Sequence, residues 1–168
     1  MFSFYNKHKN NLYTSLVKLS RNTYFYKDLG LKDTFETRII LIFIHFSIIL
    51  IRFRKKSQRS FPQDIFDNIF HNIEYHLREM GIGDVGVNKK MKLLNKIFYD
   101  ILIKLDEKKQ SKNKIIINNE IIKKHLLNEL QQNDGILSKI NSYFDGFSDF
   151  CFELDDETML KGDIKYKD

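Results

Sequence analysis

The chain has 168 residues, of which 42% are hydrophobic, and it carries a formal net charge of +6 at pH 7. This length and apolar content indicate one ordinary domain that can fold without disulfide cross-links. Its lone cysteine, Cys151, excludes an internal disulfide, and no zinc-ligand spacing accompanies it, so we expect a structural thiol in a reducing compartment.

Apolar residues recur at helical spacing along almost the whole chain, and no segment shows a clean period of two. The sequence therefore predicts an all-α fold, a single compact domain of about six helices over residues 1–168 with no significant sheet. A first helix is expected from about Lys9 to Ser20, followed by a turn at Gly30. A second helix is expected to run to about Lys55, with Asp33 as N-cap and Glu36 completing a capping box.

A third helix is expected to start around Ser60 to Pro62 and to end at Gly81. A fourth is expected from about Asn88 to Lys108, and its buried stripe consists of Met91, Leu94, Phe98, Ile101 and Leu105. Residues 118–130 and 135–147 indicate two shorter helices. The run KIIIN, Lys114–Asn118, is a strand candidate without an obvious partner, and the acidic tail from Asp155 is predicted to fray.

The most apolar run, Ile39–Ile51, has only thirteen residues between Arg38 and Arg52. A membrane-spanning helix needs about twenty apolar residues, so a buried core helix or an interfacial helix is favoured. The N-terminus shows no secretory signal pattern. We therefore expect the protein to stay on the cytoplasmic side of the membrane.

Charge is distributed unevenly, because residues 1–114 carry a net charge of +11 and residues 115–168 carry −5. The basic part suggests an anionic surface as partner, either lipid headgroups or nucleic acid, although a solvated face is the usual explanation. Four cations follow directly after the apolar run, and we expect them to meet anionic membrane headgroups, with a solvated linker as the equal alternative: Arg54, Lys55, Lys56 and Arg59.

Arg38, His45 and Arg52 stand seven residues apart, so a helix places them on one polar stripe, within about 20° per step. Buried polar groups need partners, and Glu79 and Asp84 are the first candidates. The stripe is either a satisfied internal network or part of a groove that receives another helix. A lone histidine on an apolar helix is more often a core residue than a ligand, so no metal is assigned to it.

Gly81, Gly83 and Gly86 have the spacing G-x-G-x-x-G of a phosphate-binding loop. The segment before them is helical by periodicity, whereas a dinucleotide site needs a strand there, so we expect neither ATP nor NAD to bind. We expect Gly81 at the C′ position of the third helix, and Gly83 and Gly86 at positive φ or close to backbone. No spacing indicates a catalytic constellation, and no cofactor is assigned; a nucleotide-binding enzyme is the weakest alternative.

Three segments follow one another along the chain: YKDLGLKDTFETR, the apolar run with His45, and LREMGIGDVGVNKKMK followed by FYD. Together they resemble the ubiquinol–cytochrome c chaperone family over about residues 20–105, whereas residues 115–168 form a divergent acidic part. The resemblance implies a helical, non-catalytic assembly factor for the cytochrome bc1 complex. Such proteins act beside the inner membrane on newly made cytochrome b, and in mitochondria with a small partner protein near the ribosome. The resemblance therefore implies a cytoplasmic protein that is peripheral to the inner membrane, or one on the matrix side in a mitochondrion.

With this resemblance, we expect the glycine corner and the polar stripe to bind the client, through Arg78, Glu79, Gly81, Gly83, Asp84, Gly86, Arg38, His45 and Arg52. The alternative function is a basic module that docks on the ribosome or another RNA surface, and no DNA partner is expected. Family members commonly have glycine where Asp100 follows the FY pair.

Overall fold

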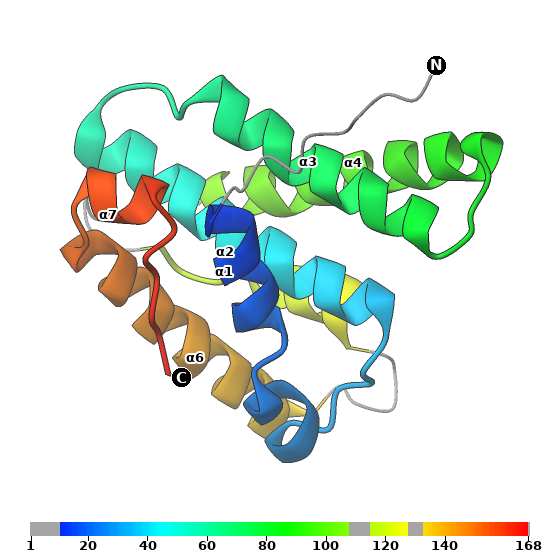
Figure 1. The fold of residues 1–168 in the computed structure, drawn as a ribbon. Coiled ribbons are helices and arrows are strands. Elements are labelled where there is room, and N and C mark those ends of the chain that lie inside the picture. The colour runs from blue at the N-terminus through cyan, green and yellow to red at the C-terminus, as the bar shows by residue number, and fades with distance from the viewer. Residues whose placement is uncertain (1–10, 108–114, 128–132, 168) are drawn as a thin grey trace.

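A computed structural model describes residues 11–107, 115–127 and 133–167, and these residues are mostly helical with no strand among them. The predicted all-α fold is confirmed. Figure 1 shows α2 at the centre of the molecule. It packs against α1, α4 and α6, so the most apolar helix forms the core.

The first part of the chain comprises α1 (Asn11–Ser20), a π-helical turn η1 (Tyr24–Asp28) and α2 (Phe35–Ser57). The predicted N-cap Asp33 is wrong, because Thr34 adopts the extended conformation of a cap and its hydroxyl accepts from the Thr37 N–H at 3.2 Å. The run from Ile39 to Ile51 is buried apart from half-buried Leu50. None of the described helices combines the length and apolarity that crossing a membrane requires.

Helices α3 (Gln63–Glu79) and α4 (Asp84–Glu107) form a hairpin across α2 (Figure 1). The predicted stripe of α4 is buried at Leu94, Phe98, Ile101 and Leu105, and Met91 is half-buried. Helix α3 buries Ile69, Ile73 and Leu77. Pro62 is the N-cap of α3, one residue before the helix begins. Helix α4 begins four residues earlier than predicted, because the Gly83 carbonyl already accepts a hydrogen bond from the Val87 N–H at 2.9 Å.

The next elements are α5 (Asn119–Ile121), the π-helical turn η2 (Ile122–Leu126) and α6 (Asp134–Glu153). The strand prediction for Lys114–Asn118 is wrong for its described residues, which adopt no regular structure. Ile115 and Ile117 are buried there, so apolar contacts rather than a ladder hold this segment. Lys114 itself, like Lys9 and Lys108 at predicted helix ends, lies outside the described residues.

The acidic tail is ordered against the core, so the prediction that it frays is wrong. Residues Asp156–Leu160 form α7, capped by the Asp155 carboxylate, which accepts from the Thr158 N–H at 2.8 Å. After α7 the chain runs along α6, and Tyr166 packs its ring on Tyr143 (Figure 1). Met159, a residue of α7, is fully buried, and this burial gives the apolar reason for the order.

Candidate functional site

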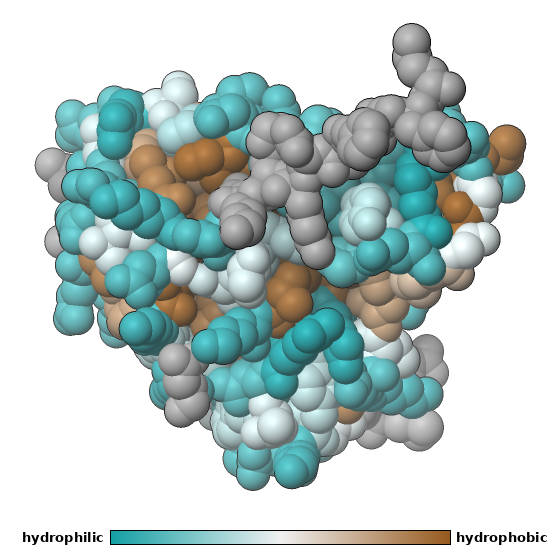
Figure 2. All heavy atoms as spheres, viewed as in Figure 1, coloured by the Kyte–Doolittle hydropathy of each residue, from teal (hydrophilic) through white to brown (hydrophobic). Residues whose placement is uncertain are grey.

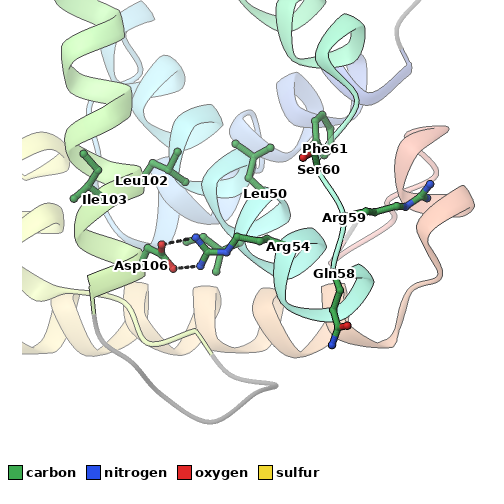
Figure 3. A pocket seen from close by; sticks show the side chains of 10 residues that line it. Leu50, Arg54, Gln58, Arg59, Ser60, Phe61, Leu102, Ile103 and Asp106 are labelled. Carbon is green, nitrogen blue, oxygen red and sulfur yellow. Dashed lines mark hydrogen bonds and ion pairs between the residues drawn. The ribbon is translucent and has the colours of Figure 1, made fainter.

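An open groove of about 730 Å³ lies between the C-terminal halves of α2 and α4, beneath the α2–α3 connector (Figure 3). Its apolar lining comes from all three segments and consists of Leu50, Ile51, Phe61, Leu102 and Ile103. Its polar lining consists of Arg54, Gln58, Arg59, Ser60 and Asp106. A concave surface with an apolar floor and a few polar groups at its edge is the usual form of a binding site.

An ion pair joins the two helices at the edge of this groove. The Arg54 guanidinium donates two hydrogen bonds to the Asp106 carboxylate, one of them at 2.7 Å from Nη1 to Oδ2 (Figure 3). These hydrogen bonds raise the pKa of Arg54. Such planar two-point pairing fixes the geometry of both side chains, so the edge of the groove has a defined shape.

The connector that covers the groove is shaped by its own backbone. Gln58 ends α2 in the left-handed conformation, with φ of 53°, and its N–H bonds to the Arg54 carbonyl at 3.2 Å. Arg59 then turns toward α7, where its guanidinium lies over the Phe53 ring and 3.4 Å from Asp156. The connector is therefore anchored to α7 on its far side, and Phe61 enters the groove wall.

The groove is lined by apolar side chains and by polar groups, several of which already have partners. Arg54 pairs with Asp106 across the groove, and Arg59 pairs with Asp156 outside it. No nucleophile stands beside a base among the lining residues. Within the described ranges, no three His, Cys, Asp or Glu side chains are grouped so as to hold a metal ion. A groove with such a lining can accept apolar side chains.

The structure separates the three members of the predicted polar stripe. Arg38 is at the surface and pairs with Asp33 at 2.7 Å. His45 and Arg52 are both fully buried. The predicted partners Glu79 and Asp84 are wrong for all three, because Glu79 lies beside His76 and Asp84 pairs with Arg78.

His45 lies in an aromatic pocket between α2 and α6. Its Nδ1 is 2.6 Å from the Leu41 carbonyl oxygen, and its Nε2 is 2.9 Å from the Tyr143 hydroxyl. Because a carbonyl only accepts, Nδ1 carries the proton and Nε2 accepts from Tyr143. Burial lowers the pKa of His45 to about 4, so the ring is neutral at pH 7. Both nitrogens are satisfied, which favours the internal-network alternative for this residue.

Arg52 ties α2 to the C-terminal part of the chain. Its Nε donates to the Cys151 carbonyl at 2.9 Å, one terminal nitrogen donates to the Leu154 carbonyl, and the other lies 2.5 Å from the Asp156 carboxylate. Partial burial raises the pKa of Asp156, but hydrogen bonds from Ser57 and Arg52 outweigh it and the pKa lies below its usual range. Sequence reasoning missed Asp156, although the capping pattern Asp155 to Thr158 could have indicated α7.

The glycine corner is a helix ending followed by a helix start. The Gly81 N–H bonds to the Arg78 carbonyl at 3.0 Å and the Ile82 N–H to the Leu77 carbonyl at 3.4 Å, which is the Schellman arrangement. Gly81 has φ of 83°, as predicted for a C′ glycine. Positive φ is wrong for Gly83 and Gly86, because Gly83 directly precedes α4 and Gly86 lies inside it.

The side chains at this corner form an exposed ion-pair cluster. Arg78 bonds to Asp84 across the corner and lies 3.1 Å from Glu74. A β-carbon at Gly83 would meet no neighbour, and one at Gly86 would meet only Cγ2 of Ile82, at 2.8 Å. The predicted close approach to backbone at these two glycines is therefore wrong, and the corner is held by Gly81 and by Arg78.

The basic run after the apolar helix is largely engaged within the molecule. Arg54 pairs with Asp106, Arg59 with Asp156, and the Lys56 ammonium lies 2.6 Å from the Phe152 carbonyl oxygen. Lys55 also has an interaction partner. These cations link α2 to α4, α6 and α7, and contact between the run and a membrane stays a prediction.

Asp100, where a glycine is common in the resembling family, lies in the middle of α4 and not in a turn. A hydrogen bond to His125, at 2.6 Å, and bonds to Lys104 and Lys124 hold the pKa of this carboxyl well below its usual range. The residue therefore joins α4 to η2.

Comparison with known proteins supports a family assignment. No curated protein matches the sequence. A solved structure, the crystal structure of the Cbp3 homolog from Brucella abortus, is similar with a TM-score of 0.68 and 27% identity, covering 94% of this chain and 87% of that one. The sequence profile of the ubiquinol–cytochrome c chaperone family matches residues 27–166, so the match includes the C-terminal part that seemed divergent. Because this match covers most of the chain, the chain belongs to the ubiquinol–cytochrome c chaperone family.

Proposed function

We propose that this protein is a non-catalytic assembly chaperone that holds newly made cytochrome b before it enters the cytochrome bc1 complex. The observation that carries the proposal is the family match over residues 27–166. The similarity to the Cbp3 homolog supports it, and so does a site whose lining is built for binding.

The groove beside Phe61 is the client site in this proposal. A helix-in-groove complex places a few apolar side chains from one helix face into a hydrophobic channel. The groove of this protein, with a volume of about 730 Å³, suits such anchoring side chains. Ile103 keeps 55% of its surface exposed at the groove wall, so apolar area is available to be covered by a client. Membrane subunits such as cytochrome b offer apolar helices that need cover before insertion.

The glycine corner is the second candidate for a client wall. Asp84 is 82% exposed there, and its carboxylate is held toward Arg78. The corner joins α3 to the start of α4, whereas the groove uses the last turns of α4, at the opposite end of the hairpin (Figure 1). One short helix cannot cover both, so variants at the two ends identify the one that binds.

Deletion of the gene tests the function directly. The level of assembled cytochrome bc1 complex should fall, and cytochrome b should co-purify with the tagged protein. Normal levels of the complex would remove the proposal. Recovery of ribosomal RNA in place of cytochrome b would support the RNA-docking alternative.

The groove is tested by Ile103→Lys, which puts a charge on the apolar wall. Co-purified cytochrome b should fall about tenfold, because burying the ammonium against an apolar client is unfavourable. Leu93→Lys is the matched control, since Leu93 lies on the same helix with similar exposure, 57%, and does not line the groove. If Asp84→Ala lowers co-purification and Ile103→Lys does not, the client binds at the corner.

A further inference from the structure

The outer face of α4 carries a row of residues that the fold does not use. We define this face as Val85, Lys89, Lys92, Lys96, Tyr99 and Ile103, which alternate at spacings of four and three. All six are exposed. The buried residues of the helix, Val87, Leu94, Phe98, Ile101 and Leu105, lie on the opposite side. The row spans about 27 Å along the helix axis.

The lysines of this face have no partner among the described residues. Their neighbours on other sides of α4 do pair, Lys90 with Glu36 at 3.8 Å and Lys104 with Asp100 at 3.1 Å. The nearby carboxylates of Asp84 and Asp100 are already engaged, by Arg78 and by the His125 cluster. Three positive charges therefore face solvent with no acidic residue among them.

Apolar side chains stand at both ends of the same row. Val85 is 83% exposed, and Tyr99 and Ile103 keep about half of their surface exposed. In the view of Figure 2 hydrophilic residues cover most of the surface, and apolar residues reach it in several places, one of which is the end where α3 turns into α4. Exposed aliphatic residues beside unpaired lysines are typical of a helix that lies on a bilayer surface.

Other occupants fit this face less well. A second copy packed on it would place three lysines in the contact, where like charges oppose each other. An RNA surface favours arginine and several stacked aromatic rings, whereas the row has no arginine, one aromatic ring at Tyr99, and aliphatic residues at Val85 and Ile103. A lipid bilayer accommodates both the lysines and the apolar residues of the row. Lysine stems lie along the apolar boundary of the bilayer, and their ammonium groups reach the lipid phosphates.

We propose that the outer face of α4 docks the protein on an anionic lipid bilayer. The basic run at Arg54 to Arg59 is the weaker surface, because its charges already bind Asp106, Asp156 and backbone carbonyls. Ile103 also lines the groove, so docking places one groove wall at the bilayer surface. Only this last consequence rests on the proposed client function; the lipid contact stands without it.

The test uses the purified full chain and vesicles, with no client present. One set is phosphatidylcholine alone, and the other is an equal mixture of phosphatidylcholine and phosphatidylglycerol. The wild-type chain should sediment with the anionic vesicles. The triple variant Lys89→Gln, Lys92→Gln, Lys96→Gln should have a partition coefficient onto these vesicles that is lower on the order of 100-fold, at about fivefold for each lysine. The control Lys18→Gln, Lys123→Gln, Lys139→Gln removes the same charge from exposed positions elsewhere and should bind nearly as the wild type does.

A second variant tests the apolar part. Val85→Ser with Ile103→Ser should weaken the binding that remains in high salt, where the lysine contribution is screened. If the two triple-lysine variants lose vesicle binding equally, the proposal is overturned, because net charge and not this face would then explain the loss. The proposal is also overturned if the outer-face triple variant binds vesicles as the wild type does but no longer binds ribosomal RNA, or no longer forms a concentration-dependent dimer. Capture of cytochrome b in detergent is measured separately, so failure of either proposal is recognised by itself.

Discussion

At the scale of the residue, His45 is an ionisable ring held neutral in the core. Its folded pKa of about 4 lies below the ordinary value of about 6.5. Between these values the unfolded chain binds a proton that the folded one does not, so stability falls as pH falls through this window. We expect urea unfolding to show a loss of about 3 kcal/mol from this residue between pH 7 and pH 4.

The control for that prediction is His45→Phe, which keeps a ring beside Tyr143 and cannot titrate. It should be less stable at pH 7, because the Tyr143 hydroxyl loses its acceptor, yet its pH dependence between 4 and 6.5 should be shallower than that of the wild type. The other histidines remain in both proteins. Parallel profiles would show that His45 is not the residue that titrates.

At the scale of the element, the α3–α4 corner depends on one glycine of its three. Gly81→Ala should lower the free energy of unfolding by about 1 kcal/mol, since φ of 83° is unfavourable for alanine. Gly86→Ala should be nearly neutral, because the gain in helix propensity, about 1 kcal/mol, offsets the shift that the Ile82 methyl must make. Thermal unfolding of the two variants checks this, with Gly83→Ala as the unstrained reference. An equal loss at Gly81 and Gly86 would contradict the corner described here.

At the scale of the whole molecule, the two ends of the described chain are clasped together. Gly162 has φ of 75°, its carbonyl accepts from the Ser15 hydroxyl, and a β-carbon there would come 2.3 Å from the Asn11 backbone. We expect Gly162→Ala to destabilise the fold by about 2–4 kcal/mol, because backbone must move to admit it. Gly135→Ala, in the first turn of α6, is the control and should cost little. Equal melting temperatures for both would show that α1 and the tail are not coupled.

The charge asymmetry of the sequence is partly resolved inside the folded molecule. Asp156, from the acidic end, pairs with Arg52 and Arg59 from the basic part, and Lys124 and His125 approach Asp100 from the other direction. The unpaired remainder includes the lysines on the outer face of α4. Pairing therefore distinguishes the charges that hold the fold from those available to a partner.

The sequence by itself determined the longer helices, because their signals are local. Side chains three and four residues apart share a face, so the stripe of α4, the helical state of Ile39–Ile51 and the ending at Gly81 followed from neighbours along the chain. The family was also recognisable from local segments such as REMGIGD, and the profile match confirmed it.

Only the tertiary structure decided which groups meet. His45 bonds to a hydroxyl 98 residues away and Arg52 to a carboxylate 104 residues away, and periodicity says nothing about contacts at such separations. The groove likewise needs Phe61 and Leu102 brought together by the crossing of α2 and α4. The packing of several helices sets these distances together. The sequence therefore showed correctly that the buried polar groups need partners, but the partners chosen from it, Glu79 and Asp84, were wrong.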